Sequence, residues 1–289
     1  MFATGSLARR IERAEASLIA DCAAAAARRG GDQRVFMMPL RGGVGAFVEP
    51  GSPINKVAGL GFDGIPDDEE MTAIEEAYVE RGCPVLVELS SFADPLVGRL
   101  LTRRDYELIG YENVSGKELQ PESSAAPELD DSLTITRVGE AEAADWLDAV
   151  TRGFLTPDAY DGLPSHESYD REVIERATDD MATAEGFERY VVYRNGELAG
   201  GASFRSFGGV AQLCGSATLP QHRRRGVQTA LLRHRLVEAA RRGCDVAVVT
   251  TQPGSKSQQN VQRSGFAVLY VRAVLVRPIR GTADAGRAE

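Results

Sequence analysis

The sequence predicts an α/β protein with mixed sheets, arranged as two domains. The chain has 289 residues, which is enough for two ordinary domains. Its 43% hydrophobic and 26% charged residues are typical of a globular protein in water. Helical and strand patterns alternate on both sides of a polar connector. We therefore predict a first domain at 1–118, a linker at 119–132, a second domain at 133–280 and a disordered tail at 281–289.

Composition excludes several classes of function. A net charge of -9 argues against a nucleic-acid partner. No run approaches the roughly 18 apolar residues of a membrane helix, so no membrane partner is expected. The cysteines are Cys22, Cys83, Cys214 and Cys244, and their wide spacing suggests neither a disulfide framework nor a metal site. We expect a cytoplasmic protein with reduced thiols and no metal.

The first domain begins with a helix that Gly30-Gly31 ends. Two strands then flank the Arg41-Gly42-Gly43 turn, as in a hairpin. A later helix opens with acidic residues in its first turn, where the helix dipole favours them. The predicted order is helix 7–28, strands 34–39, 43–48 and 55–62, helix 66–81, strand 84–89, helix 94–103 and strand 106–114.

The second domain has the turn signals of a hairpin sheet followed by a βαβ unit. Asn195-Gly196 is the strongest hairpin dipeptide in the chain. The predicted order is strand 133–137, helices 140–154 and 169–183, strands 189–193, 198–205 and 210–219, a helix from 227 to Gly243, strand 246–250 and strand 267–277. Strands 210–219 and 246–250 should pair in parallel, with the loop between strand and helix at a carboxyl end, where ligands bind.

The stretch from Leu213 to Gln228 predicts an anion site. It contains a strand, a proline, the basic turn Arg223-Arg224-Arg225-Gly226 and the first residues of a helix. Such a turn directs several backbone N–H groups to one point, and the helix dipole adds partial positive charge there. An anion is the natural ligand of this loop.

These residues resemble a known family. Arg223-x-x-Gly226-x-Gln228 is similar to the acyl-CoA pyrophosphate loop of the GNAT (GCN5-related) N-acetyltransferases, usually written Gln/Arg-x-x-Gly-x-Gly/Ala. Thr218-x-Pro220 and the helix opening Thr229–Leu232 resemble its flanks, while Gln228 departs from the pattern. The resemblance implies domains with a mixed, mostly antiparallel sheet flanked by helices. It also implies direct transfer of an acetyl group from acetyl-CoA to an amine of a small-molecule acceptor.

The resemblance assigns cofactor-binding residues. Backbone amides of the loop would hold the phosphates, and the preceding strand would pair with pantetheine amides. Residues 252–266, ending in Gly265-Phe266, resemble the second conserved region of the family, where two polar residues face the CoA arm or only solvent. The predicted set is Ser216, Ala217, Thr218, Arg223, Arg224, Arg225, Gly226, Val227, Gln228, Ser257 and Asn260.

No catalytic residue is assigned. Gly254 stands where the family often has an asparagine, and Val261 stands where it often has a tyrosine that serves as general acid. Tyr270 is a weak candidate for the acid and fits a core aromatic better. His222 and His234 are expected on a loop and on a helix surface. Water could remove the proton from the acceptor amine without a dedicated base, because the proximity of amine and thioester supplies much of the rate.

The first domain has much of the same element order but lacks the basic loop. Its equivalent, Gly61–Asp68, carries aspartates that would repel a pyrophosphate. We interpret this half as a degenerate GNAT-like copy that does not bind CoA; an unrelated α/β domain is the alternative. Strands that paired in a different order in the two halves would exclude the duplication. This half could complete the acceptor pocket, form a homodimer or support the second domain.

Two other functions remain open at this stage. The absent tyrosine and asparagine suit a catalytically silent acyl-CoA-binding or regulatory protein with the same fold. A nucleic-acid protein could use the arginines of the basic loop and its helix, but the acidic balance and the lack of interleaved aromatic residues disfavour it.

Overall fold

One mixed sheet of 11 strands forms the centre of the protein in the computed structural model, which describes residues 1–30, 34–120, 130–156 and 169–279. The strand order is β1-β2-β3-β4-β11-β5-β10-β9-β8-β7-β6. The stretch 160–166, whose Gly, Pro, Ser and Asp residues predict a loop, lies outside the described residues. Most of the predicted linker and the predicted tail also lie outside them. The mixed α/β architecture predicted from the sequence is confirmed.

The N-terminal half contains every element predicted for it, in the predicted order. These are α1 (Gly5–Arg29), β1 (Phe36–Leu40), β2 (Gly43–Phe47), β3 (Lys56–Ala58), α2 (Asp68–Val79), β4 (Val85–Ser90), α3 (Pro95–Arg103) and β5 (Glu107–Glu118). Strand β3 is shorter than predicted. Gly59 and Gly61 follow it with positive φ angles of 73° and 87°, which turn the chain out of the strand.

The C-terminal half also follows the predicted order. Its elements are β6 (Leu133–Arg137), α4 (Ala143–Leu155), α5 (Arg171–Ala182), β7 (Phe187–Arg194), β8 (Glu197–Phe207), β9 (Val210–Thr218), the 3₁₀ turn η2 (Pro220–His222), α6 (Val227–Arg241), β10 (Val246–Thr251), α7 (Lys256–Arg263) and β11 (Ala267–Arg277). Strands β9 and β10 pair in parallel, as expected of the βαβ unit.

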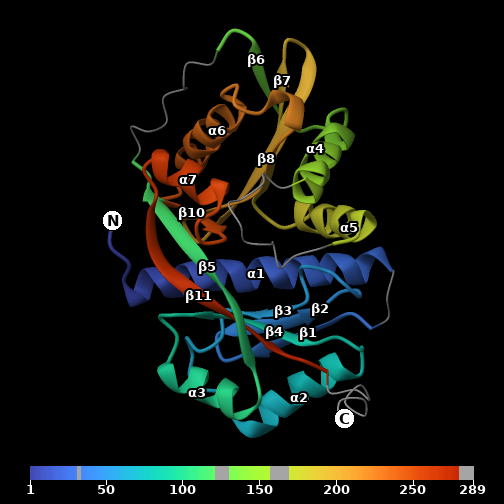
Figure 1. The fold of residues 1–289 in the computed structure, drawn as a ribbon, viewed down its shortest axis with the longest axis vertical. Helices are drawn as coiled ribbons and strands as arrows, with labels where there is room; N and C mark the ends of the chain where they lie inside the picture. The colour runs from blue at the N-terminus through green and yellow to red at the C-terminus, as the bar shows by residue number, and fades with distance from the viewer. Residues whose placement is uncertain (31–33, 121–129, 157–168, 280–289) are drawn as a thin grey trace, which may run out of the picture.

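The two halves exchange strands. Strand β5 of the first half lies between β10 and β11, and β11 of the second half lies between β4 and β5. The β5–β10 ladder runs from Asn113↔Thr251 to Glu118↔Val246, and the β11–β4 ladder runs from Arg272↔Ser90 to Arg277↔Val85. Figure 1 shows β5 and β11 crossing from one half to the other. The halves therefore share a single sheet.

The predicted strand 106–114 ended too early, because Ser115–Glu118 form the end of β5. Close packing accounts for the small side chains at Ser115 and Gly116, which hide the strand pattern. Ser115 is fully buried, and a Cβ on Gly116 would lie 2.5 Å from Leu269 Cδ1. Backbone pairing with strands on both sides holds this segment in the sheet.

Strand pairing is the same in both halves. Strands β1 to β4 pair antiparallel, antiparallel and parallel, and β7 to β10 repeat that series. This shared pairing order does not exclude the duplication, which stays a hypothesis. The boundaries at 118 and 133 stay a prediction, and a cut there would leave β5 and β11 in different pieces.

Helices cover the sheet on both faces and join the halves. Gly201 faces α4, where its Cβ would meet Trp146 and Val150, whereas the adjacent Ala202 packs in the cluster that contains Leu231 of α6. Adjacent strand residues point to opposite faces, so α4 and α6 cover opposite sides. Helix α1 lies across the middle of the molecule and packs against β2, β3, β9 and α5 (Figure 1).

Candidate functional site

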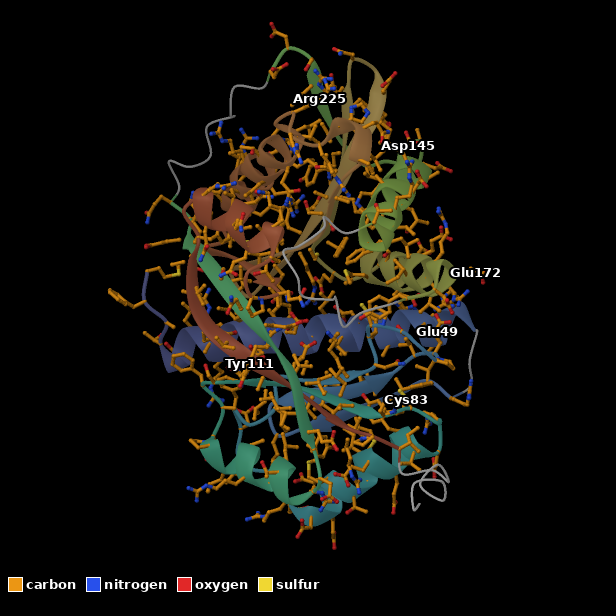
Figure 2. The ribbon with its side chains drawn as sticks, viewed as in Figure 1. Glu49, Cys83, Tyr111, Asp145, Glu172 and Arg225 are labelled. Atoms are coloured by element: carbon orange, nitrogen blue, oxygen red, sulfur yellow. The ribbon has the colours of Figure 1, made fainter. Side chains whose placement is uncertain are left out.

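The N-terminus of α6 is open. Gly226 is its N-cap in the left-handed conformation, with φ 78°, and no side chain caps the helix. The first turn of α6 contains no acidic residue. Arg224 and Arg225 precede it and are exposed. Figure 2 shows Arg225 at the outer end of the C-terminal half, far from α2 and α3. The backbone amides of the first turn therefore remain available to an anion.

The corresponding helix of the N-terminal half is closed. Asp67 caps α2 and forms a capping box with Glu70, and residues 68–70 are all acidic. In the preceding loop, Asp63 forms ion pairs with Arg9 and Arg13 of α1. The protein's own carboxylates thus occupy the place that a phosphate would take, which supports the interpretation of a copy that does not bind CoA.

Strands β9 and β10 diverge beside the open helix end. They pair at three positions, from Val210↔Val246 to Gln212↔Val248, and both continue beyond this ladder. A bulge in β9 follows at Gly215, where φ is 51° and a Cβ would lie 2.8 Å from Ser203 Oγ. The facing strand edges can therefore accept the amides of an inserted pantetheine arm.

A buried arginine holds the bulge. Arg235 of α6 is 2% exposed, and its guanidinium donates to Ser203 O at 2.9 Å, Cys214 O at 3.5 Å and Ser216 Oγ at 3.2 Å. Burial lowers its pKa to about 10. These bonds tie α6 to carbonyl groups beside the bulge, so Arg235 preserves the shape of the open strand end.

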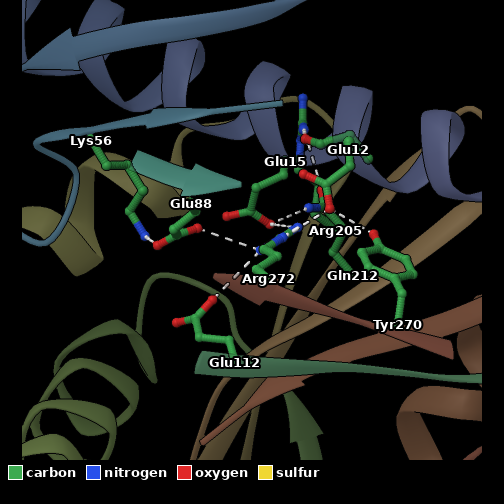
Figure 3. Close-up of polar contacts among 10 residues, drawn as sticks. Glu12, Glu15, Lys56, Glu88, Glu112, Arg205, Gln212, Tyr270 and Arg272 are labelled. Atoms are coloured by element: carbon green, nitrogen blue, oxygen red, sulfur yellow. Dashed lines mark hydrogen bonds and ion pairs between the residues drawn. The ribbon is translucent and has the colours of Figure 1, made fainter. Parts of the chain in front are cut away.

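A cavity of about 360 Å³ lies between the diverging strands. Ser216, Gln228, Ser257 and Val261 line it near the open end of α6. A second group of lining residues carries charge and comes from the sheet centre and α1: Glu15, Lys56, Glu88, Glu112 and Arg272 (Figure 3). The cavity thus joins the predicted cofactor loop to a charged wall.

Some of the predicted cofactor-binding residues line the cavity, and others contact different parts of the protein. Ser216, Gln228 and Ser257 line it, and Gly226 and Val227 form the helix start. Ala217 packs against Gly153 of α4. The Arg223 guanidinium bonds Thr156 O at 2.6 Å and Thr218 O at 3.3 Å, so it also ties the loop to its neighbours. The binding roles of the set, including Thr218, Arg224, Arg225 and Asn260, stay predictions.

Tyr270 is a core aromatic, as favoured. It is 5% exposed, and its hydroxyl donates to Glu12 Oε1 at 2.6 Å. His234 is half-buried, with its ring centroid 4.8 Å from that of Tyr190. The expectation of a surface loop was wrong for His222, which is 4% exposed because the turn η2 folds its ring inward. Neither histidine lines the cavity.

Sequence reasoning missed the charged wall. The available signal was a charged residue within an otherwise apolar strand: Glu88 in β4 and Arg272 in β11. Such residues need buried partners. The partners lie on elements distant in the sequence, so periodicity alone could not identify them.

Comparisons with known proteins agree with this geometry. Residues 151–266 match the model of the acetyltransferase (GNAT) family. This part of the C-terminal half is therefore similar to a family of acetyltransferases. No curated protein matches the chain. In the described ranges, no helix is long and apolar enough to cross a membrane, and no metal-binding group of His, Cys, Asp or Glu gathers.

Solved structures show the same fold across both halves. A GCN5-related N-acetyltransferase from Kribbella flavida is 19% identical, with a TM-score of 0.61 over 91% of this chain and 97% of that one. A tandem GNAT protein from the clavulanic acid biosynthesis pathway is 14% identical, with a TM-score of 0.59 over 91% and 89%. A GCN5-related N-acetyltransferase from Sphaerobacter thermophilus is 18% identical, with a TM-score of 0.55 over 75% and 69%. The protein thus has a tandem GNAT fold.

Proposed function

We propose that this protein is an acetyl-CoA-dependent N-acetyltransferase that acts on a small-molecule amine in the cytoplasm. The observation that carries the proposal is the uncapped N-terminus of α6, which opens beside the diverging strands β9 and β10 and their cavity. An acyl donor that carries a pyrophosphate and a chain of amides matches both features. Acetyl-CoA supplies the acetyl thioester, and residues of the loop and β9 bind and orient it.

The cavity size supports a small acceptor. Its volume of about 360 Å³ lies at the lower end of the range of roughly 300–1,000 Å³ for small-molecule sites. Direct transfer requires the amine and the thioester side by side, and a single cavity beside the predicted cofactor loop supports this. Proximity and exclusion of water then contribute much of the rate.

Calorimetric titration of the full chain with acetyl-CoA tests the binding step. We expect one equivalent to bind, at the C-terminal half. Two equivalents would contradict the interpretation of the N-terminal half as a copy that does not bind CoA. No binding would contradict the proposed function. Release of the CoA thiol, followed across a panel of amines, then tests for transfer.

A catalytically silent acyl-CoA-binding protein is the second candidate. Val261 is 3% exposed and lines the cavity, so this position offers the leaving thiolate no hydroxyl proton. Binding of acetyl-CoA with no thiol release above the rate of hydrolysis, for every amine tested, would favour this candidate. A homodimer also remains a proposal, to be tested by light scattering.

A further inference from the structure

The N-terminal half supplies most of the charged wall of the cavity. Glu15 lies on α1, Lys56 on β3, Glu88 on β4 and Glu112 on β5, whereas Arg272 lies on β11 of the C-terminal half. Glu112 reaches the cavity because β5 is inserted between β10 and β11. The N-terminal half, which we interpret as a copy that does not bind CoA, thus contributes carboxylates to the cavity beside the predicted cofactor loop.

Negative charge exceeds positive charge within this wall. Lys56 forms an ion pair with Glu88. Arg272 makes its closest contact with Glu12, at 2.8 Å, which also accepts a hydrogen bond from Tyr270. The Arg272 guanidinium is farther from three other carboxylates, at 3.5 Å from Glu88, 3.7 Å from Glu15 and 3.8 Å from Glu112. Two cations, Lys56 and Arg272, therefore face three carboxylates in the wall (Figure 3), and the closest contact of Arg272 is with Glu12, which does not line the cavity.

Glu112 has the weakest compensation of the three carboxylates that line the cavity. Its Oε2 is buried and has no hydrogen-bond partner within the described part of the chain. Its closest cation, Arg272, is already bonded to Glu12. Glu15, by contrast, accepts a hydrogen bond from Gln212, and Glu88 from Lys56. The Glu112 side chain as a whole is 23% exposed and lines the cavity, so a cationic ligand there can reach its carboxylate and pair with it.

We propose that Glu112 is the catalytic base and that the acidic wall selects an acceptor amine that enters as a cation without a carboxylate. This inference rests on the proposed function. It gives the N-terminal half a direct part in the reaction, through a strand that the other half encloses.

The proton and bond changes balance as follows. The Glu112 carboxylate takes one proton from the acceptor ammonium and leaves a neutral amine. The amine nitrogen then forms a bond to the thioester carbonyl carbon, and the C–S bond breaks. The second nitrogen proton goes to the departing CoA thiolate, and Glu112 returns its proton to solvent. The products are an amide, free CoA thiol and one proton.

The electrostatic surroundings suit this role. Burial and the carboxylate of Glu88 raise the pKa of Glu112 to about 8, Lys56 and Arg272 act in the opposite direction, and Glu15 adds to the rise. A base is most effective when its pKa lies near the working pH. An ammonium group in the cavity stabilises the ionised carboxylate, so acceptor binding and proton transfer assist each other.

Two experiments on the full chain test the inference. First, CoA thiol release is measured with cationic amines, putrescine, spermidine, tyramine and tryptamine, and with the carboxylate-bearing amines glutamate, glycine and lysine. We expect at least a tenfold higher kcat/KM for the best cationic amine. Preference for a carboxylate-bearing amine, or release with none of these amines, would overturn the proposed selectivity.

Second, Glu112→Gln is compared with Glu107→Gln, the same change at an exposed position on the same strand. We expect Glu112→Gln to lower kcat about 100- to 1,000-fold and to remove the rise of kcat/KM through about pH 8. Glu112→Asp should restore part of the rate, and Glu107→Gln should match the parent. The acetyl-CoA Kd and the unfolding midpoint report whether each variant is folded.

The outcomes separate the two proposals. If the parent binds no acetyl-CoA, the proposed function fails. If the parent acetylates an amine and Glu112→Gln binds acetyl-CoA but keeps its kcat and pH profile, only the role of Glu112 fails. If Glu112→Gln does not fold, Glu112→Asp provides the test instead. An unchanged pH profile of kcat/KM in Glu112→Asp would overturn the role of Glu112 as the base.

Discussion

Arg272 lies directly opposite Glu112 in the β11–β5 ladder, and its Nη1 is 3.8 Å from Glu112 Oε2. The same guanidinium donates to Glu12 Oε1 from Nε at 2.8 Å. One arginine, 1% exposed, therefore holds carboxylates from α1 and β5 together where the halves exchange strands. Its position links the stability of the fold to the charge of the cavity.

Arg272→Met should destabilise the protein by about 3–5 kcal/mol, because it leaves buried carboxylates without their cation. The loss should be smaller at pH 5 than at pH 8, since protonation of those carboxylates removes the uncompensated charge. Urea unfolding at both pH values measures this. Arg137→Met is the control: Arg137 is 67% exposed in its pair with Glu188, so about 1 kcal/mol or less is expected. Equal losses of stability in the two variants would contradict the role of Arg272 as the cation that compensates buried carboxylates.

Glu112 should make stability depend on pH. Its folded-state pKa of about 8 lies above the ordinary value of 4.5, so between these values the folded state binds the extra proton. Stability from this group is therefore present below pH 4.5 and is lost as the pH rises toward 8. Glu112→Gln should match the parent in urea unfolding at pH 4 and exceed it at pH 9. A difference independent of pH would show that Glu112 titrates normally.

Gly226→Glu should abolish acetyl-CoA binding, because it places a carboxylate at the open end of α6. Gly243→Glu is a matched control at the other end of the helix. Both glycines have φ 78°, and a Cβ at either position meets nothing within 4 Å, so the backbone strain should be similar. Calorimetry should show binding only in the Gly243 variant. Unchanged affinity in Gly226→Glu would mean that the loop is misassigned.

Arg225→Ala should weaken acetyl-CoA binding several-fold and make the affinity less sensitive to salt, because an exposed cation beside the phosphates acts through a screened charge. Arg233→Ala removes an equally exposed arginine farther along α6 and should leave binding unchanged. Affinities at 50 and 300 mM salt measure the effect. Equal losses in both variants would point to the general charge of the protein.

Residues 130–289 alone should not fold stably, because this fragment lacks β5, which forms ladders with both β10 and β11. Co-expression with residues 1–120 as a separate chain should restore a 1:1 complex that binds acetyl-CoA. Size-exclusion chromatography and circular dichroism provide the measurement. A stable, monomeric 130–289 fragment would show that the exchanged strands are dispensable.

The sequence by itself determined the element order and the basic turn before α6. Local signals sufficed, because Asn195-Gly196 encodes a hairpin and Arg223–Gly226 encodes a turn before a helix. Residues near one another in the chain settle such features. The same locality explains why the family resemblance is carried by a few short stretches of the chain.

Only the tertiary structure decided the strand exchange and the charged wall. Ser115 and Gly116 show no strand pattern, because tight packing between two neighbouring strands selects small residues there. Glu12 and Arg272 are separated by most of the chain, and neither sequence position specifies the other. Long-range pairing of charges depends on which strands become neighbours, and periodicity along the chain does not encode that.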